Sequence, residues 1–96
     1  MVASGSIGRA GAVGREAGEM LSAYVLIETE VGKVAHVSQA LTKLDGVQLA
    51  EDLAGPYDVI ANVQAPSLDE LGRLVASHIQ LLDGVTRTVT CMVLHR

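Results

Sequence analysis

The same four residues, Leu-Asp-Gly-Val, occur twice in this chain, at residues 44–47 and again at residues 82–85. Each copy follows a stretch whose apolar residues have helical spacing and precedes a stretch that reads as a strand. Asp-Gly at such a point is typical of a helix end, because glycine readily adopts the left-handed conformation of the C-terminal cap. The repeat therefore predicts two similar corners, at each of which a helix returns to a sheet.

The patterns around the two corners predict a β-α-β-β-α-β order. Strands are expected over residues 23–29, 47–53, 57–64 and 85–94, and helices over residues 33–44 and 67–82. Ser67 and Glu70 form a capping box at the start of the second helix. With right-handed crossovers, this order predicts an α+β, ferredoxin-like sandwich. Its antiparallel sheet has strand order 4-1-3-2, and both helices lie on one face.

The core has to be built from aliphatic side chains, because the 96-residue chain contains no Phe or Trp and only two Tyr. One face of the second helix is expected to pack against this core, and its residues are Leu71, Leu74, Val75, His78 and Leu82. His78 is accordingly expected to be a packed histidine, and His36, opposite the apolar stripe of its own helix, a solvated one. A core this small gives limited stability alone, and one sheet face stays uncovered. We therefore expect dimerisation between sheet faces, the dimeric α+β barrel arrangement.

Charge and composition exclude several classes of protein. The net charge of −4 and the scattered basic residues argue against direct binding of DNA or RNA. One cysteine, Cys91, cannot form an internal disulfide and fits a reducing compartment. No apolar run reaches the roughly 18–20 residues of a membrane span, and no secretory signal is visible. The sequence predicts a cytoplasmic protein without membrane contact.

Residues 1–19 differ from the rest of the chain, because glycine recurs in a polar background. Such a segment loses too much conformational entropy to fold alone, so we predict a disordered tail. Met20 is an alternative natural start, in which case the tail lies upstream of the protein. The folded domain is expected over residues 20–96.

Nothing in the sequence demands catalysis. The separations between His36, His78 and His95 match no metal-ligand spacing, so neither a metal nor a cofactor is expected. Cys91 in the middle of a strand is expected to be buried and inert, and no nucleophile has a base at a suitable spacing. The chain is therefore not predicted to be an enzyme.

Two segments remain as candidate binding elements. The turn at residues 55–58, Gly-Pro-Tyr-Asp, could hold a small ligand through its N–H groups and the carboxylate of Asp58. The alternative is an ordinary hairpin turn in which Asp58 bonds to its own backbone. Residues 86–90 carry a hydroxyl at every second position. That pattern fits either a solvated strand face or the wall of a polar site.

Together these segments resemble a known family. The motifs are, in chain order, Gly55-x-Tyr57-Asp58, a capped helix, Leu82-x-Gly84-Val85 and Thr88-x-Thr90. They are similar to the C-terminal effector-binding domain of Lrp/AsnC transcription regulators, the RAM (regulation of amino acid metabolism) domain. The opening AYVLIETEVGK is similar to the first strand and turn of that domain, and the resemblance covers about residues 21–95.

The resemblance implies a βαββαβ sandwich that dimerises through its sheets and assembles further, often into octamers. It implies that an amino acid or similar effector binds in clefts between dimers. Carried over to this chain, the site residues are Gly55, Tyr57 and Asp58 from the loop, Thr88, Thr90 and Cys91 from the last strand, and Leu68 from the helix start.

One departure from the family pattern is large. A full-length member carries a helix-turn-helix domain before this module, whereas only the Gly-rich segment precedes it here. The resemblance therefore implies a stand-alone form that does not bind DNA itself, and that senses an amino acid or co-assembles with full-length regulators. The alternatives are an ACT-like ligand module with its site at residues 31–33, an assembly adaptor that binds no ligand, and, least favoured, a small dimeric α+β barrel enzyme.

Overall fold

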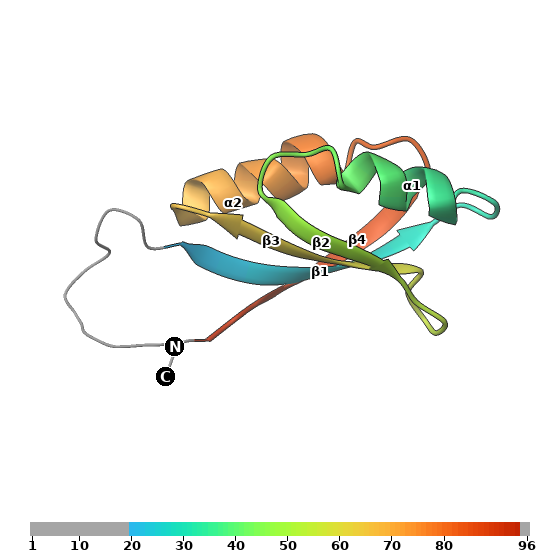
Figure 1. Cartoon of the computed structure of the whole chain (residues 1–96), viewed down its shortest axis with the longest axis horizontal. Coiled ribbons are helices and arrows are strands. Elements are labelled where there is room, and N and C mark those ends of the chain that lie inside the picture. Colours follow the sequence, from blue (N-terminus) through green and yellow to red (C-terminus); the bar gives the residue numbers. More distant parts are fainter. Residues whose placement is uncertain (1–19, 95–96) are drawn as a thin grey trace.

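The sheet of this protein has four antiparallel strands, and both helices lie on one of its faces (Figure 1). The computed structural model describes residues 20–94, so the predicted tail at residues 1–19 and His95 lie outside the described part. The elements are β1 (Leu21–Thr29), α1 (Val34–Leu41), β2 (Val47–Asp52), β3 (Val59–Ala65), α2 (Leu68–Leu74), the π-helical turn η1 (Val75–Ile79) and β4 (Val85–Met92). The order β2-β3-β1-β4 is the predicted 4-1-3-2 order read from the other edge, which confirms the ferredoxin-like sandwich.

The core lies between the sheet and the helices, and it is entirely aliphatic. Every second residue of β1 and β3 points into it, as the alternating pattern requires. The fully buried side chains from the strands are Ala23, Val25, Ile27, Val59, Ala61 and Val63. The helical side supplies Val37, Leu41, Leu71 and Ile79. Short branched side chains fill the space that an aromatic core would otherwise occupy.

The two predicted corners are present and similar. Gly46 and Gly84 both have positive φ angles, 96° and 99°. The carbonyl oxygen of Gly46 accepts a hydrogen bond from the backbone N–H of Gln64 at 2.8 Å, and that of Gly84 accepts one from Glu30 at 2.8 Å. Each corner is therefore bonded directly to a strand or strand end. The repeated tetrapeptide encodes the same connection in both halves of the fold.

The second helix starts as predicted but ends differently. The hydroxyl of Ser67 accepts a hydrogen bond from the backbone N–H of Glu70 at 3.2 Å, which confirms the cap. Farther along, the N–H of Gln80 bonds to the carbonyl of Val75, five residues back, at 2.9 Å. This wider π-type turn rotates less per residue than an α-helix. The prediction of a packed His78 is therefore wrong: His78 is exposed, and Ile79 is buried in the core instead.

The open face of the sheet, opposite the helices, carries apolar side chains. Leu26 lies across from Ile60 on one side and Val89 on the other, and all three are half-buried. A register shift in β2 between Val47 and Leu49 places Leu49 on this face as well, with 52% of it exposed. Such a face is expected to meet a partner.

Cys91 also lies on the open face, across from Tyr24. The prediction that Cys91 is buried is wrong, because its side chain is exposed. The reason is that β4 is an edge strand and that the helices cover the other face of the sheet. None of the helices among residues 20–94 has the length and apolar character needed to cross a membrane.

Candidate functional site

The loop between β2 and β3, residues 53–58, is at the end of the sheet where β1 runs into α1 (Figure 1). It is closed by a hydrogen bond from the N–H of Leu53 to the carbonyl of Asp58 at 2.8 Å. The N–H of Asp58 donates to the carbonyl of Ile27 in β1 at 2.9 Å. The loop is therefore attached to the central strand as well as to its own two strands.

The carboxylate of Asp58 strengthens this attachment. Its Oδ2 atom accepts hydrogen bonds from the backbone N–H of Thr29 at 2.8 Å and from the Thr29 hydroxyl at 3.3 Å. The interpretation that Asp58 bonds to its own backbone is therefore wrong, because its partner is the end of β1. A half-buried carboxylate with charge-assisted bonds of this kind fixes the loop in one position.

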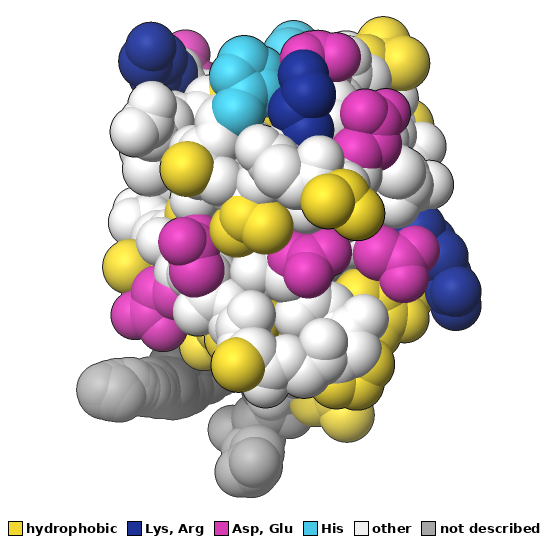
Figure 2. Space-filling model, turned by 90° about the vertical axis from the view of Figure 1, so that its right-hand side faces the viewer, with side chains coloured by type: hydrophobic (Ala, Val, Ile, Leu, Met, Phe, Trp, Pro, Cys, Tyr) yellow, Lys and Arg dark blue, Asp and Glu magenta, His cyan; other side chains and the backbone are white. Residues whose placement is uncertain are grey.

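The residues between these anchors are presented outward. Gly55 is exposed, and a Cβ atom added there would meet nothing within 4 Å, so there is open space in front of its backbone. Tyr57 is half-buried. Figure 2 shows this end of the molecule, where acidic side chains lie around a band of hydrophobic ones. Val31 and Leu53 are among the exposed hydrophobic residues of its turns.

The hydroxyl row of β4 lies on the helix-covered face. Thr88 is across from Ile27 and Thr90 is across from Val25, and both partners point into the core. Thr88 accepts a hydrogen bond from the side-chain amide of Gln80 at 3.0 Å, while Thr90 is exposed at the sheet edge. Cys91 points to the opposite face, so β4 divides its three predicted site residues between two surfaces.

Leu68 is at the other end of the molecule. It opens α2 directly after β3, and 65% of it is exposed. The seven residues of β3 separate it from Asp58, a length of roughly 20 Å at the usual rise of a strand. One protomer therefore does not bring these residues together: Leu68 is at the far end of β3 from Asp58, Thr88 and Thr90 are on the helix-covered face of β4, and Cys91 is on its open face.

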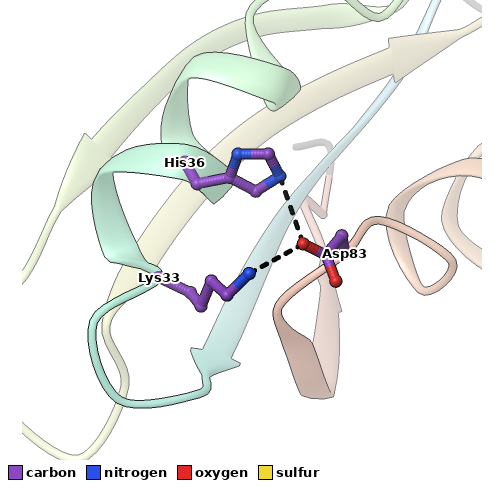
Figure 3. Close-up of polar contacts among 3 residues, drawn as sticks. All are labelled: Lys33, His36 and Asp83. Carbon is purple, nitrogen blue, oxygen red and sulfur yellow. Dashed lines mark hydrogen bonds and ion pairs between the residues drawn. The ribbon is translucent and has the colours of Figure 1, made fainter.

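A charged cluster connects the start of α1 to the second corner (Figure 3). The ammonium group of Lys33 is 2.9 Å from Oδ2 of Asp83, and Nε2 of His36 is 3.6 Å from the same atom. The hydrogen bond and charge of Lys33 lower the pKa of the Asp83 carboxyl, and Asp83 raises the pKa of Lys33. His36 is exposed, as the sequence predicts. The cluster connects the two halves of the fold at their surface.

This cluster predicts a pH-dependent contribution to stability. Because folding lowers the pKa of Asp83 from 3.8, its contribution is complete above that value and is lost as the pH falls through the lowered pKa. Because folding raises the pKa of Lys33 from 10.5, its contribution is lost as the pH rises beyond that value. Melting temperatures should show that Lys33→Met destabilises the protein at neutral pH, slightly and less at high salt, since the pair is exposed. An equal loss at pH values outside this window, or in the control Lys43→Met, would contradict the assignment.

Within the described residues, no group of three or more His, Cys, Asp and Glu side chains is placed to hold a metal ion. Two features stand out instead. One is the loop at residues 53–58, which is hydrogen-bonded to β1 and in which Gly55 faces open space. The other is the apolar open face of the sheet. The fold defines a class of protein, namely a small α+β module of the ferredoxin-like sandwich type.

Comparison with known proteins identifies the family. Residues 22–96 match the family described as the Lrp/AsnC ligand binding domain. An uncharacterized HTH-type transcriptional regulator of Pyrococcus abyssi is 30% identical over 78 residues, which are 81% of this chain and 49% of that protein. The crystal structure of a Thermus thermophilus protein is 32% identical, with a TM-score of 0.75, and the match covers 79% of this chain and 95% of that one. The chain belongs to the Lrp/AsnC family.

The share of each relative's length that this chain matches bears on function. The chain spans about half the length of the curated regulator that it matches. A homocitrate synthase of Saccharolobus islandicus is also 33% identical over 60 residues, which are 62% of this chain and only 13% of the synthase. The region in common is thus a small part of an enzyme and half of a regulator.

Proposed function

We propose that this chain is an effector-binding regulatory module without catalytic activity. It oligomerises through its open sheet faces and binds a small effector, an amino acid, in clefts between dimers. The observation that carries this proposal is the match of residues 22–96 to the ligand-binding domain of the Lrp/AsnC family.

The two kinds of relative support a ligand-binding role. A transcription regulator and a synthase perform different tasks, yet each has a segment similar to this chain. A role that suits both settings is the sensing of a small molecule, which then alters the activity of the attached part. The family match also favours this role over the ACT-like alternative with its site at residues 31–33.

The separation of the candidate residues supports a cleft between subunits. Asp58 and Leu68 are at opposite ends of β3, and Thr90 and Cys91 are on opposite faces of β4. A single protomer cannot place all of them around one small ligand. Contacts between neighbouring protomers can bring the loop of one against another surface of the next.

The chemistry of the loop suits an amino acid. Backbone N–H groups of the exposed turn, other than that of Pro56, which has none, can receive a carboxylate. The acidic side chains that Figure 2 shows on this face, beside Lys, Arg and His side chains, can receive an ammonium group. Since Oδ2 of Asp58 already accepts two bonds from Thr29, we assign Asp58 chiefly to positioning the loop. Gly55 and Tyr57 are then the residues closest to the effector.

We further propose that the chain works in the cytoplasm through protein partners. Its net charge of −4 does not favour direct contact with DNA. Co-assembly with full-length Lrp/AsnC regulators, into octamers for example, would couple effector binding to transcription. An adaptor that joins such assemblies without a ligand is the competing function, and it predicts co-purification with a regulator but no response to any amino acid.

Replacing Gly55 with alanine tests the loop. The fold tolerates the change, because the added methyl group meets nothing and the φ angle is not in the positive region. A ligand held close to that backbone would be displaced, so affinity for the effector should fall about tenfold or more while the melting temperature of the free protein hardly changes. Gly72→Ala in α2, which also has open space, is the matched control. Equal affinities of the two variants in calorimetry would remove Gly55 from the site.

A further inference from the structure

A hollow of about 400 Å³, here called the α2 hollow, lies between α2 and the turn that follows α1. Its apolar floor is formed by Leu44 and Leu74. The turn is packed tightly against the helix: a Cβ atom placed on Gly46 would lie only 2.9 Å from a methyl group of Leu74. The volume is within the range of sites that bind small molecules. In Figure 1 this turn passes beside α2, away from the loop at residues 53–58.

The charges around the floor are of both signs. Asp45 from the turn and Glu70 from α2 supply carboxylates, and Lys43 and Arg73 supply cationic groups. Among residues 20–94 the ion pairs join Lys33 and His36 to Asp83, so none of these four side chains is within ion-pair distance of another. A hollow with separate acidic and basic groups above an apolar floor is complementary to a zwitterion with an apolar side chain.

The π-helical turn completes this arrangement. It leaves His78 at the edge of the α2 hollow, with Nδ1 of its ring 3.5 Å from the carbonyl oxygen of Arg73, five residues back. In a regular α-helix, residues five apart point in clearly different directions, whereas in a π-turn they lie one above the other. Wide turns of this kind occur frequently at functional sites. The helix thus departs from regular geometry where it brings a third nitrogen-bearing side chain to the hollow.

We propose that the α2 hollow is a second small-molecule site, contained within one protomer, which takes a zwitterionic amino acid with an apolar side chain. Arg73 and Lys43 hold the carboxylate, Glu70 and Asp45 hold the ammonium group, and the side chain lies on Leu44 and Leu74. This site is separate from the proposed cleft at the loop of Gly55, and it does not depend on contacts between dimers.

An amide NMR titration of the full chain with L-leucine tests this site. Isocaproate and isoamylamine, which each lack one of leucine's charged groups, are the comparison ligands. Leucine should shift the resonances of Asp45, Gly46 and Arg73 more strongly than either analogue does. Glu70→Gln should weaken leucine binding about tenfold, as expected for the loss of a charge-assisted bond. Asp69→Asn is the matched control, because it removes the same charge from the same helix turn but does not line the hollow.

The outcomes separate this site from the proposed cleft. Shifts in the α2 hollow that need about tenfold more leucine in Glu70→Gln and are unchanged in Gly55→Ala support the inference, whether or not the loop responds. Shifts confined to residues 53–58 overturn it while supporting the cleft. Equal leucine affinities of Glu70→Gln and Asp69→Asn overturn it, and so does isocaproate or isoamylamine binding as tightly as leucine. Unchanged resonances in the hollow at millimolar leucine also overturn it.

Discussion

Replacing Gly46 with alanine is expected to destabilise the fold by about 2–5 kcal/mol. A residue with a side chain at a φ of 96° costs about 1–2 kcal/mol. The added methyl group would also be 2.9 Å from Leu74 and 3.0 Å from the backbone oxygen of Gln64, and overpacking of this kind costs about 1–3 kcal/mol. For a domain of this size the melting temperature should fall by roughly 8–40 °C.

The effect of a glycine-to-alanine change on stability depends on the position of the glycine. Gly72 lies inside α2 with open space around it, so Gly72→Ala should raise stability by up to about 1 kcal/mol. Gly84→Ala should behave like Gly46→Ala, because its φ is 99° and the new methyl group would meet Lys33 at 2.9 Å. Thermal unfolding of the three variants is the measurement. A Gly46→Ala protein as stable as the wild type would contradict the account of the two corners.

Replacing Leu26 with glutamate is expected to dissociate the proposed dimer of open sheet faces. Leu26 is on the central strand β1, on the open face, between Ile60 and Val89. In a dimer formed through these faces a carboxylate at this position would be taken out of water without a partner. Burying an unpaired charge costs several kcal/mol per ion, and two-fold symmetry would apply the cost twice. Light scattering after size-exclusion chromatography should report the mass of a monomer.

The control for this experiment adds the same charge to the helical side. Gln39 is exposed on α1, so Gln39→Glu should keep the oligomer of the wild type. Far-UV circular dichroism shows whether Leu26→Glu remains folded as a monomer. A folded Leu26→Glu protein with the mass of the wild-type oligomer would exclude the open face as the interface.

The fold could be predicted from the sequence because its signals are local and agree with one another. Positive-φ glycines at both corners, the cap at Ser67 and the alternation in β3 each fix a short segment. Once six elements are in order, crossover handedness leaves few arrangements. The strand and helix ends differ by a few residues, as in the first helix, which is expected over residues 33–44 and observed as Val34–Leu41.

The failures come from interactions that a helical or strand period does not describe. His78 fits the apolar stripe of a regular helix, but the π-turn changes the rotation and buries Ile79 instead. The carboxylate of Asp58 accepts a hydrogen bond from Thr29, which is far away in the sequence, and no local sequence pattern predicts such a contact. Cys91 occupies a strand of the expected type, but its exposure depends on which face the helices cover. The α2 hollow likewise joins a turn to a distant helix, so it has no signal in the sequence.

The central claim is that this module binds an amino acid at the loop of residues 53–58. The most direct measurement is a thermal-shift screen of the protein with each common amino acid at millimolar concentration, beside the variant Gly55→Ala. A ligand at about 100 times its dissociation constant stabilises by about 2.7 kcal/mol, a shift of roughly 10–20 °C. The account predicts such a shift for one or a few amino acids, and a shift of about half that size or less in Gly55→Ala, whose affinity is expected to be about tenfold weaker. A melting temperature that none of them changes would contradict it and favour an adaptor without a ligand.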